Sequence, residues 1–330
     1  MDNLESQTEN ELINNKQGNK KGPLSGLSPL FFIFLSLTLI FFLYQIVGGT
    51  ISFMLLGESM EINTENLNIT RVILSFAQFM FILVPALVLV MLQDNNLKET
   101  FRLYKPKLSV FILSLFGILV IQPFLQVYLY YQNELIFSLP FGQDFIIQLK
   151  ELFEMLESTT EKLVTANSFP EFMLIVLVIA VTPAICEEFL FRGLVFKNFE
   201  KILPASKAVF FSGLLFALFH FHPFNVIPLI VLGVFLTFIV YHSGSIYTAV
   251  VCHFINNLIS ATAVYMYGTE SLATDKLSGD EQIQFLILGV FSLAAFLTVI
   301  FLIKKNSVKN NNRISDTDSE KLTVNSSSNE

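Results

Sequence analysis

The chain has 330 residues, of which 20 are Lys or Arg and 27 are Asp or Glu, so 14% are charged, against roughly 25% in a soluble domain. Hydrophobic residues reach 53%, with 36 Phe and a mean hydropathy of +0.62, and because one soluble core cannot bury that much apolar surface, we expect an integral, multi-pass membrane protein. The net charge of −7 excludes nucleic acid as a partner, since phosphates require a basic surface, and two cysteines exclude a disulfide scaffold.

Eight apolar segments approach the length of about 20 residues that a helix needs to cross a hydrocarbon layer of ~30 Å. They lie near residues 30–56, 72–92, 108–131, 171–201, 207–222, 226–243, 245–268 and 283–304. We therefore predict an all-α fold, a polytopic bundle of about eight transmembrane helices. The segment 207–222 is the shortest of the eight and 171–201 is the longest, so their ends are the hardest to place.

Polar segments divide the chain further. Residues 1–28 and 306–330 are rich in polar and charged residues and are predicted to be disordered cytoplasmic tails. Apolar residues at helical spacing among acids predict an amphipathic helix at 144–165, either on the outer membrane surface or packed on the bundle. Residues 29–167 are expected to form a three-span region that includes this helix. Residues 168–268 are expected to form a central domain, and residues 269–305 the last transmembrane helix.

The positive charges support this arrangement, because Lys and Arg collect in cytoplasmic loops. With the N-terminus inside, 16 of the 20 Lys and Arg residues fall in segments that eight spans place inside the cell. The exceptions are Arg71, Lys150, Lys162 and Lys276. An even number of spans then puts both termini in the cytoplasm, and we expect the protein in the plasma (inner) membrane of a bacterium, with the lipid bilayer as its surroundings.

The fourth span contains three charges that would each cost a few kcal/mol or more if they faced lipid. Glu188 and Arg192 are four residues apart, so they share a helix face and can pair. Glu187 is turned about 100° around the helix and is left available for another purpose. Pro183 predicts a break that frees a backbone carbonyl beside the carboxylates. Alternatively, all three charges lie at a cytoplasmic helix end in contact with water.

Other polar residues match Glu187 in depth. If the fourth helix runs to about Lys201, a rise of ~1.5 Å per residue puts Glu187 about 21 Å from the inner boundary. His220 is then about 20 Å deep, Asn257 about 18 Å and His253 about 12 Å. His253 and Asn257 are four residues apart and project from one face of the seventh span. The four side chains are therefore expected to converge on one layer inside the membrane.

Three motifs in this order resemble those of a known family. They are Glu187-Glu188-x-x-x-Arg192, Phe216-x-x-x-His220 and His253-x-x-x-Asn257. Together they resemble the CAAX prenyl protease and bacteriocin-processing family of intramembrane proteases, which includes type II CAAX endopeptidase-like and lysostaphin resistance protein A-like members. The resemblance covers about residues 168–268 and leaves the first three spans and the last one unexplained.

The resemblance implies a CAAX-type intramembrane endopeptidase that cleaves a peptide or protein substrate at the membrane, such as a prenylated C-terminal peptide or a leader peptide. Glu187 and His220 would hold and activate a water molecule, while His253 and Asn257 would stabilise the oxyanion. General acid–base chemistry and donors aimed at developing negative charge are what peptide hydrolysis requires. Glu188 and Arg192 would have a supporting role and orient the helix of the first motif.

A metal is the open point of this interpretation. Glu187, His220 and His253 are also the ligand types of a catalytic zinc with an open position, and the family includes proteins described as metalloproteases. The sequence has no His-Glu-x-x-His motif. We therefore favour a glutamate-type enzyme without a cofactor and keep zinc as the alternative.

Two other functions use the same residues differently. A non-proteolytic membrane scaffold or a bacteriocin immunity protein could keep the buried network for packing alone. A proton-coupled transporter could use intramembrane Glu, Arg and His side chains as a proton path. Transport is the weaker alternative, because the predicted first three spans carry no intramembrane charge and the two halves show no repeat.

Overall fold

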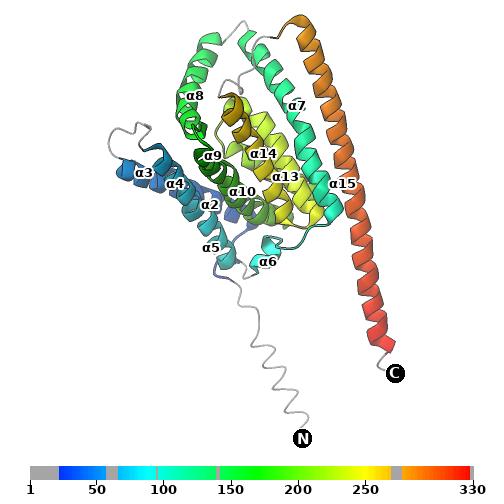
Figure 1. The fold of residues 1–330 in the computed structure, drawn as a ribbon. Helices are drawn as coiled ribbons and strands as arrows, with labels where there is room; N and C mark the ends of the chain where they lie inside the picture. Colours follow the sequence, from blue (N-terminus) through cyan, green and yellow to red (C-terminus); the bar gives the residue numbers. More distant parts are fainter. Residues whose placement is uncertain (1–21, 57–65, 94–95, 139–141, 269–276, 328–330) are drawn as a thin grey trace.

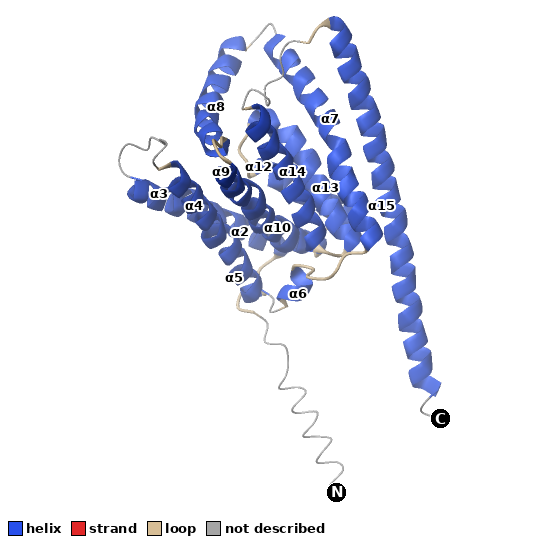
Figure 2. Ribbon diagram, viewed as in Figure 1, coloured by secondary structure: helices blue, strands red, loops and turns tan. Residues whose placement is uncertain are grey.

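A computed structural model describes residues 22–56, 66–93, 96–138, 142–268 and 277–327. Every regular element among these residues is a helix, as Figures 1 and 2 show, so the predicted all-α fold is confirmed. Most of the predicted N-terminal tail, 1–21, lies outside the described residues.

The first half of the chain forms three long helical stretches and one amphipathic helix. Their elements are α2 (Pro29–Phe41), η1 (Phe42–Gly48), α3 (Gly49–Leu56), α4 (Leu67–Gln78), η2 (Phe79–Leu83), α5 (Val84–Gln93), the short α6 (Leu97–Thr100), α7 (Leu108–Ser138) and α8 (Gln143–Val164). The segments η1 and η2 are π-helical and continue the helices on either side of them.

The second half begins with one long stretch and ends with the C-terminal helix. Its elements are α9 (Phe169–Ile175), the π-helical η3 (Val176–Val181), α10 (Thr182–Glu188), the π-helical η4 (Phe189–Val195), α11 (Phe196–Glu200), α12 (Ala205–Leu218), the 3₁₀ turn η5 (Pro223–Asn225), α13 (Val226–Ser243), α14 (Ile246–Tyr267) and α15 (Gly279–Ser327). The fourth stretch thus continues past Arg192 to Glu200, close to the predicted end at Lys201.

Seven of these stretches are long and apolar enough to cross a membrane, close to the predicted eight. The eighth segment corresponds to α12, which is apolar but has only 14 residues. The prediction that a helix contains His220 is wrong, because α12 ends at Leu218 and His220 lies in the following turn. A helix cannot run on to residue 222, because Phe221 has a positive φ of 51° and Pro223 disfavours helical geometry in His222, which is extended with φ −117° and ψ 96°.

Contacts between distant segments place the two ends of the bundle on one face. The backbone N–H of Leu24, just before α2, donates to Leu92 at the end of α5 over 2.9 Å. Lys107, just before α7, donates to the carbonyl of Asn306 in α15 over 3.1 Å. The start of the first span and the end of the last therefore lie on the same side, while the cytoplasmic location of that side stays a prediction.

The C-terminal segment differs from its prediction in secondary structure. We expected a tail at 306–330, but α15 continues as helix to Ser327 and projects past the other helices in Figure 1. The residues from Asn306 onward include no Pro or Gly, the two residues that most readily end a helix. An apolar helix that enters this segment can therefore continue through it.

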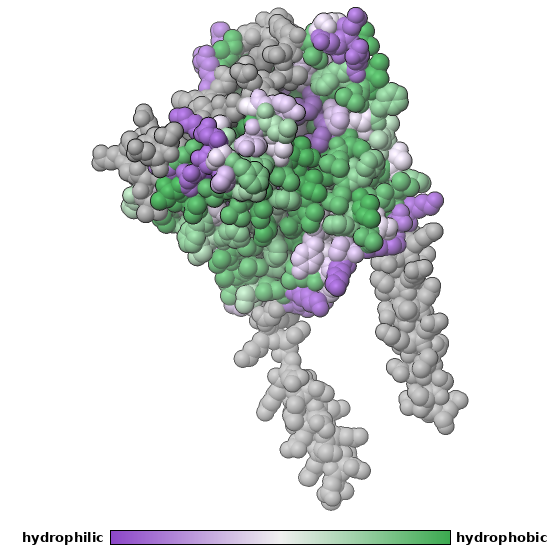
Figure 3. All heavy atoms as spheres, viewed as in Figure 1, coloured by the Kyte–Doolittle hydropathy of each residue, from purple (hydrophilic) through white to green (hydrophobic). Residues whose placement is uncertain are grey.

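The surface is typical of a protein in a bilayer. Figure 3 shows a broad hydrophobic band across the middle of the face in view, with hydrophilic residues gathered above and below it. Large apolar side chains of the candidate spans are well exposed, for example Phe116, Leu119 and Phe301. Such exposure is unfavourable in water and favourable in lipid, so the fold is that of an integral, multi-pass membrane protein.

The predicted amphipathic helix at 144–165 is present as α8. Its C-terminal end is held by Arg71 of α4, whose side chain is fully buried. The Arg71 guanidinium donates to the carbonyls of Leu163 and Thr165 over 2.9 and 2.6 Å, and to Oδ1 of Asn68 over 2.6 Å. Because helix ends leave carbonyls without partners, Arg71 fixes this end of α8 to the bundle.

Two glycines allow α12 and α13 to approach closely beside the fourth stretch. A Cβ atom on Gly213 would lie 2.4 Å from the backbone nitrogen of Val234, and one on Gly233 would lie 2.6 Å from the carbonyl oxygen of Gly213. Small residues at such crossings let backbones pack together within a membrane. This contact brings the carbonyl of Gly233 and the ring of Phe216 next to the charges of the fourth stretch.

Candidate active site

One cavity of about 300 Å³ lies among α7, the fourth stretch, α12, α13 and α14. All four residues predicted to be catalytic line it, together with two further polar residues: Glu187, His220, His253, Asn257, Asn256 and Ser260. The rest of the wall is apolar and consists of Ile118, Ile179, Pro183, Phe216, Leu229, Leu232 and Leu236. The structure thus brings together the four predicted side chains, which are up to 70 positions apart in the chain.

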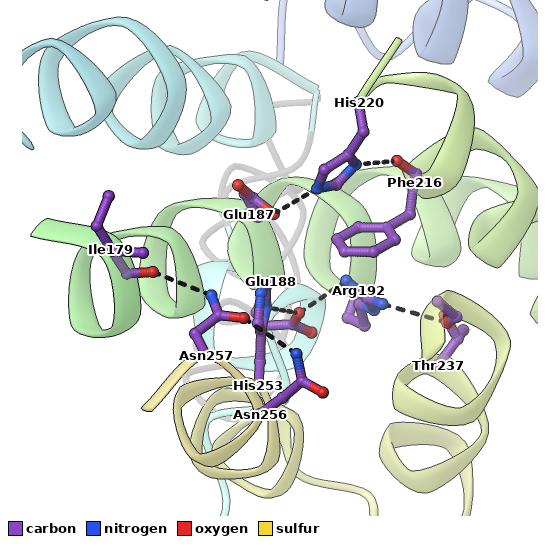
Figure 4. A network of polar contacts seen from close by, with 11 residues as sticks. Ile179, Glu187, Glu188, Arg192, Phe216, His220, Thr237, His253, Asn256 and Asn257 are labelled. Carbon is purple, nitrogen blue, oxygen red and sulfur yellow. Dashed lines mark hydrogen bonds and ion pairs between the residues drawn. The ribbon is translucent and has the colours of Figure 1, made fainter. Parts of the chain in front are cut away.

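Glu187 and His220 face each other across this cavity (Figure 4). Nε2 of His220 lies 3.7 Å from Oε2 of Glu187, and the two side chains are 31% and 19% exposed, although Oε2 itself is buried. Nδ1 of His220 donates to the carbonyl of Phe216 over 2.7 Å. Since that carbonyl can only accept, Nε2 of the neutral ring is a lone-pair nitrogen directed at the carboxylate.

Glu188 forms a second polar group with Arg192 and His253. Its Oε1 accepts from Nη1 of Arg192 over 2.7 Å, which confirms the predicted pair at positions i and i+4, and both side chains are completely buried. The same oxygen lies 2.8 Å from Nδ1 of His253, a contact that sequence spacing did not indicate. The carboxylate therefore compensates the Arg192 charge and orients the His253 ring at once.

Phe216 fills the space between these two groups. The Arg192 guanidinium lies 4.4 Å from the centre of its ring and donates through Nη2 to the carbonyl of Gly233 over 3.2 Å. The ring centres of His220 and His253 lie 4.6 and 5.8 Å from that of Phe216. The Phe of the second motif thus contacts the key side chain of each motif, which explains its place four residues before His220.

Asn257 is held by a chain of amides that the sequence analysis missed. Its Nδ2 donates to the carbonyl of Ile179 over 3.1 Å, and its Oδ1 accepts from Asn256 over 3.1 Å. Asn256 in turn accepts from Nε2 of Gln122 on α7 over 3.0 Å. In the sequence, Asn256 is visible as a second Asn beside Asn257, and Gln122 as a polar residue before Pro123 in an apolar segment. Nothing in the sequence indicates that these two residues contact each other.

The two cysteines that precede motif residues take no part in this arrangement. Cys186 and Cys252 are both completely buried, and neither of these two described residues forms a disulfide. They act as small apolar side chains in the packed bundle.

The side chains considered as zinc ligands do not assemble into a metal site. In the described parts of the chain, no three His, Cys, Asp or Glu side chains gather closely enough to hold a metal ion. We therefore assign no step of the chemistry to a metal.

Comparison with known proteins identifies one related family. Searches of curated proteins and of solved structures gave no match to the chain. A family model, that of the Rce1-like type II CAAX prenyl endopeptidases, matches residues 169–259. This region runs from the start of α9 into α14 and includes all three motifs. The resemblance indicated by those motifs is thus confirmed: residues 169–259 match the Rce1-like type II CAAX prenyl endopeptidase family.

Proposed function

We propose that the protein is an intramembrane endopeptidase that hydrolyses a peptide bond in a membrane-associated substrate, with a prenylated C-terminal peptide or a leader peptide as candidates. The main support is the shared cavity, in which Glu187 and His220 face each other while His253 and Asn257 line the same space. The family match at residues 169–259 supports the same reaction class. The bacterial plasma membrane as its location stays a prediction.

In this proposal Glu187 and His220 activate the attacking water. A separation of 3.7 Å is too long for a direct hydrogen bond, but a water molecule about 2.8 Å from both atoms can donate one hydrogen to each. Oε2 of Glu187 is buried and accepts no hydrogen bond from the described residues, so in this proposal the carboxylate turns towards the cavity when the water binds. With its two hydrogens engaged, the water directs an oxygen lone pair at the substrate carbonyl, and Glu187 accepts the proton as the oxygen–carbon bond forms.

His253 and Asn257 then stabilise the tetrahedral intermediate. Nδ1 of His253 is bonded to Glu188, so Nε2 donates to the oxyanion when the ring is an imidazolium. In that state the charges of Glu187, Glu188, Arg192 and His253 sum to zero, the balance that a buried site requires. Asn257 supplies an uncharged donor. The intermediate collapses when the carbon–nitrogen bond breaks and the proton on Glu187 passes to the leaving amine.

The apolar part of the wall suits a substrate that arrives from the membrane. Ile118 comes from α7, and Leu229, Leu232 and Leu236 come from α13. Such a surface favours an isoprenyl chain or apolar side chains over a charged peptide. The chemistry of the wall therefore restricts the substrate to apolar classes without naming one.

Comparison of the host proteome in wild type and in a strain carrying Glu187→Ala tests the function and identifies the substrate. We expect a peptide terminus in a membrane or secreted protein that is present with wild type and disappears with the variant. A strain carrying Glu171→Gln is the matched control, because Glu171 is a half-buried carboxylate at the far end of the same stretch and does not line the cavity. Identical termini in all three strains would contradict proteolysis and favour a scaffold.

A further inference from the structure

A continuous line of hydrogen bonds crosses the cavity wall from α7 to the fourth stretch. Nε2 of Gln122 donates to the carbonyl of Ile118 over 2.9 Å and to Oδ1 of Asn256 over 3.0 Å. Asn256 donates to Oδ1 of Asn257, and Asn257 donates to the carbonyl of Ile179, each over 3.1 Å. Figure 4 shows the part of this line from Asn256 to Ile179. Three side-chain amides are thus connected between two backbone carbonyls.

The carbonyl at the far end lies close before Pro183, which has no backbone N–H to donate. In an α-helix the carbonyl of residue 179 accepts from the backbone N–H of residue 183, and proline has none. The stretch before it is π-helical over Val176–Val181, a geometry often found at functional sites. Asn257 donates to the carbonyl of Ile179, a contact between α14 and the fourth stretch next to Pro183.

The two carbonyl ends give the line a single direction. A carbonyl oxygen only accepts, so the Ile118 end fixes the NH₂ group of Gln122 and the Ile179 end fixes that of Asn257. If the Asn257 amide were reversed, its oxygen would face the Ile179 oxygen and its NH₂ would face that of Asn256. Both contacts are repulsive. One N–H of Asn257 bonds Ile179, and its second N–H can donate to a group bound in the cavity.

We propose that Gln122 and Asn256 are positioning residues, which act through Asn257 by holding its amide with a donor directed at the oxyanion. This inference rests on the proposed function. It also assigns a role to α7, which lies outside the region 169–259 that matches the family. An oxyanion site requires donors fixed in place before reaction, and an Asn that could rotate freely would present its oxygen part of the time.

The test measures cleavage of a quenched-fluorescent farnesylated peptide by purified full-length protein in liposomes. Gln122→Leu and Asn256→Leu are each expected to lower kcat about tenfold, the effect of losing roughly one hydrogen bond of 1.4 kcal/mol, with KM within twofold of wild type. The double variant is expected to lose no more kcat than either single variant, since Gln122 and Asn256 belong to the same line of hydrogen bonds. Asn256→Ser, whose hydroxyl both donates and accepts, is expected to retain more activity than Asn256→Ala.

Gln126→Leu is the matched control, because Gln126 is the exposed glutamine one turn further along α7; we expect wild-type kcat from it. Thermal unfolding of each variant checks that the fold is kept. Wild-type kcat for Gln122→Leu and Asn256→Leu would overturn the inference, as would losses that multiply in the double variant or that change KM alone. Failure of wild type itself to cleave the peptide would instead count against the proposed function.

Discussion

Oε1 of Glu188 lies 2.8 Å from Nδ1 of His253, a hydrogen bond between the fourth stretch and α14 across 65 positions of the chain. The same oxygen accepts from Nη1 of Arg192 over 2.7 Å, and the side chains of Glu188 and Arg192 are fully buried. Glu188 therefore serves stability by compensating Arg192 and serves the site by orienting His253. Mutation can separate these two contributions.

Glu188→Ala is expected to lower the free energy of unfolding by about 3–5 kcal/mol, because it leaves the Arg192 charge buried without a partner. Replacing both residues, as Glu188→Leu with Arg192→Leu, removes the uncompensated charge and is expected to recover most of that loss. The double variant is still expected to cleave at least tenfold more slowly than wild type, since His253 has lost the carboxylate that orients it. Unfolding in detergent and kcat are the two measurements. Wild-type kcat in the double variant would show that His253 needs no such partner.

Arg71 makes a separate prediction about α8. Its guanidinium donates to the carbonyls of Leu163 and Thr165, and hydrogen bonds from charged groups contribute about 1.5–3 kcal/mol. Arg71→Gln is expected to raise amide hydrogen exchange in residues 143–164 while exchange in α14, 246–267, stays at the wild-type rate. Unchanged exchange in 143–164 would mean that other contacts hold the helix.

Metal removal distinguishes the two versions of the chemistry. Because the described His, Cys, Asp and Glu side chains form no cluster of three suited to a metal, we expect full activity after exhaustive chelation and dialysis. Cleavage of the farnesylated peptide before and after treatment is the measurement, with the same protein returned to zinc, magnesium or calcium as controls. Loss of activity that zinc alone restores would contradict a glutamate-type reaction.

The sequence predicts the bundle closely because each span is a long apolar run and lipid accepts apolar side chains on every face. The segments 226–243 and 245–268 were placed almost to the residue, since Gly244 and Gly268 both have positive φ and end the helices there. The shorter α12 was harder to predict. Its run of apolar residues continues beyond Leu218, and the effect of Pro223 on the chain before it carries no signal in hydropathy.

The candidate site was predictable only in part. Helical spacing identifies neighbours on one helix, so the pair Glu188 and Arg192 followed from the sequence. Contacts between helices depend on how the helices rotate against each other, and spacing carries no information on that. The bonds from Glu188 to His253 and from Gln122 to Asn256 are of this second kind, 65 and 134 positions apart. The depth of each residue along its helix correctly predicts that the four candidate residues lie in one layer, but it does not predict which side chains they contact.

The most direct test of the central claim is the cleavage rate of the farnesylated peptide by wild type, Glu187→Gln and Glu171→Gln, purified and reconstituted in liposomes. Glutamine keeps the size of Glu187 and removes the group that accepts the proton of the attacking water, so we expect kcat to fall by at least ~100-fold. Glu171→Gln is expected to cleave at the wild-type rate, and all three proteins are expected to unfold at similar temperatures. Cleavage by Glu187→Gln at the wild-type rate would contradict the account.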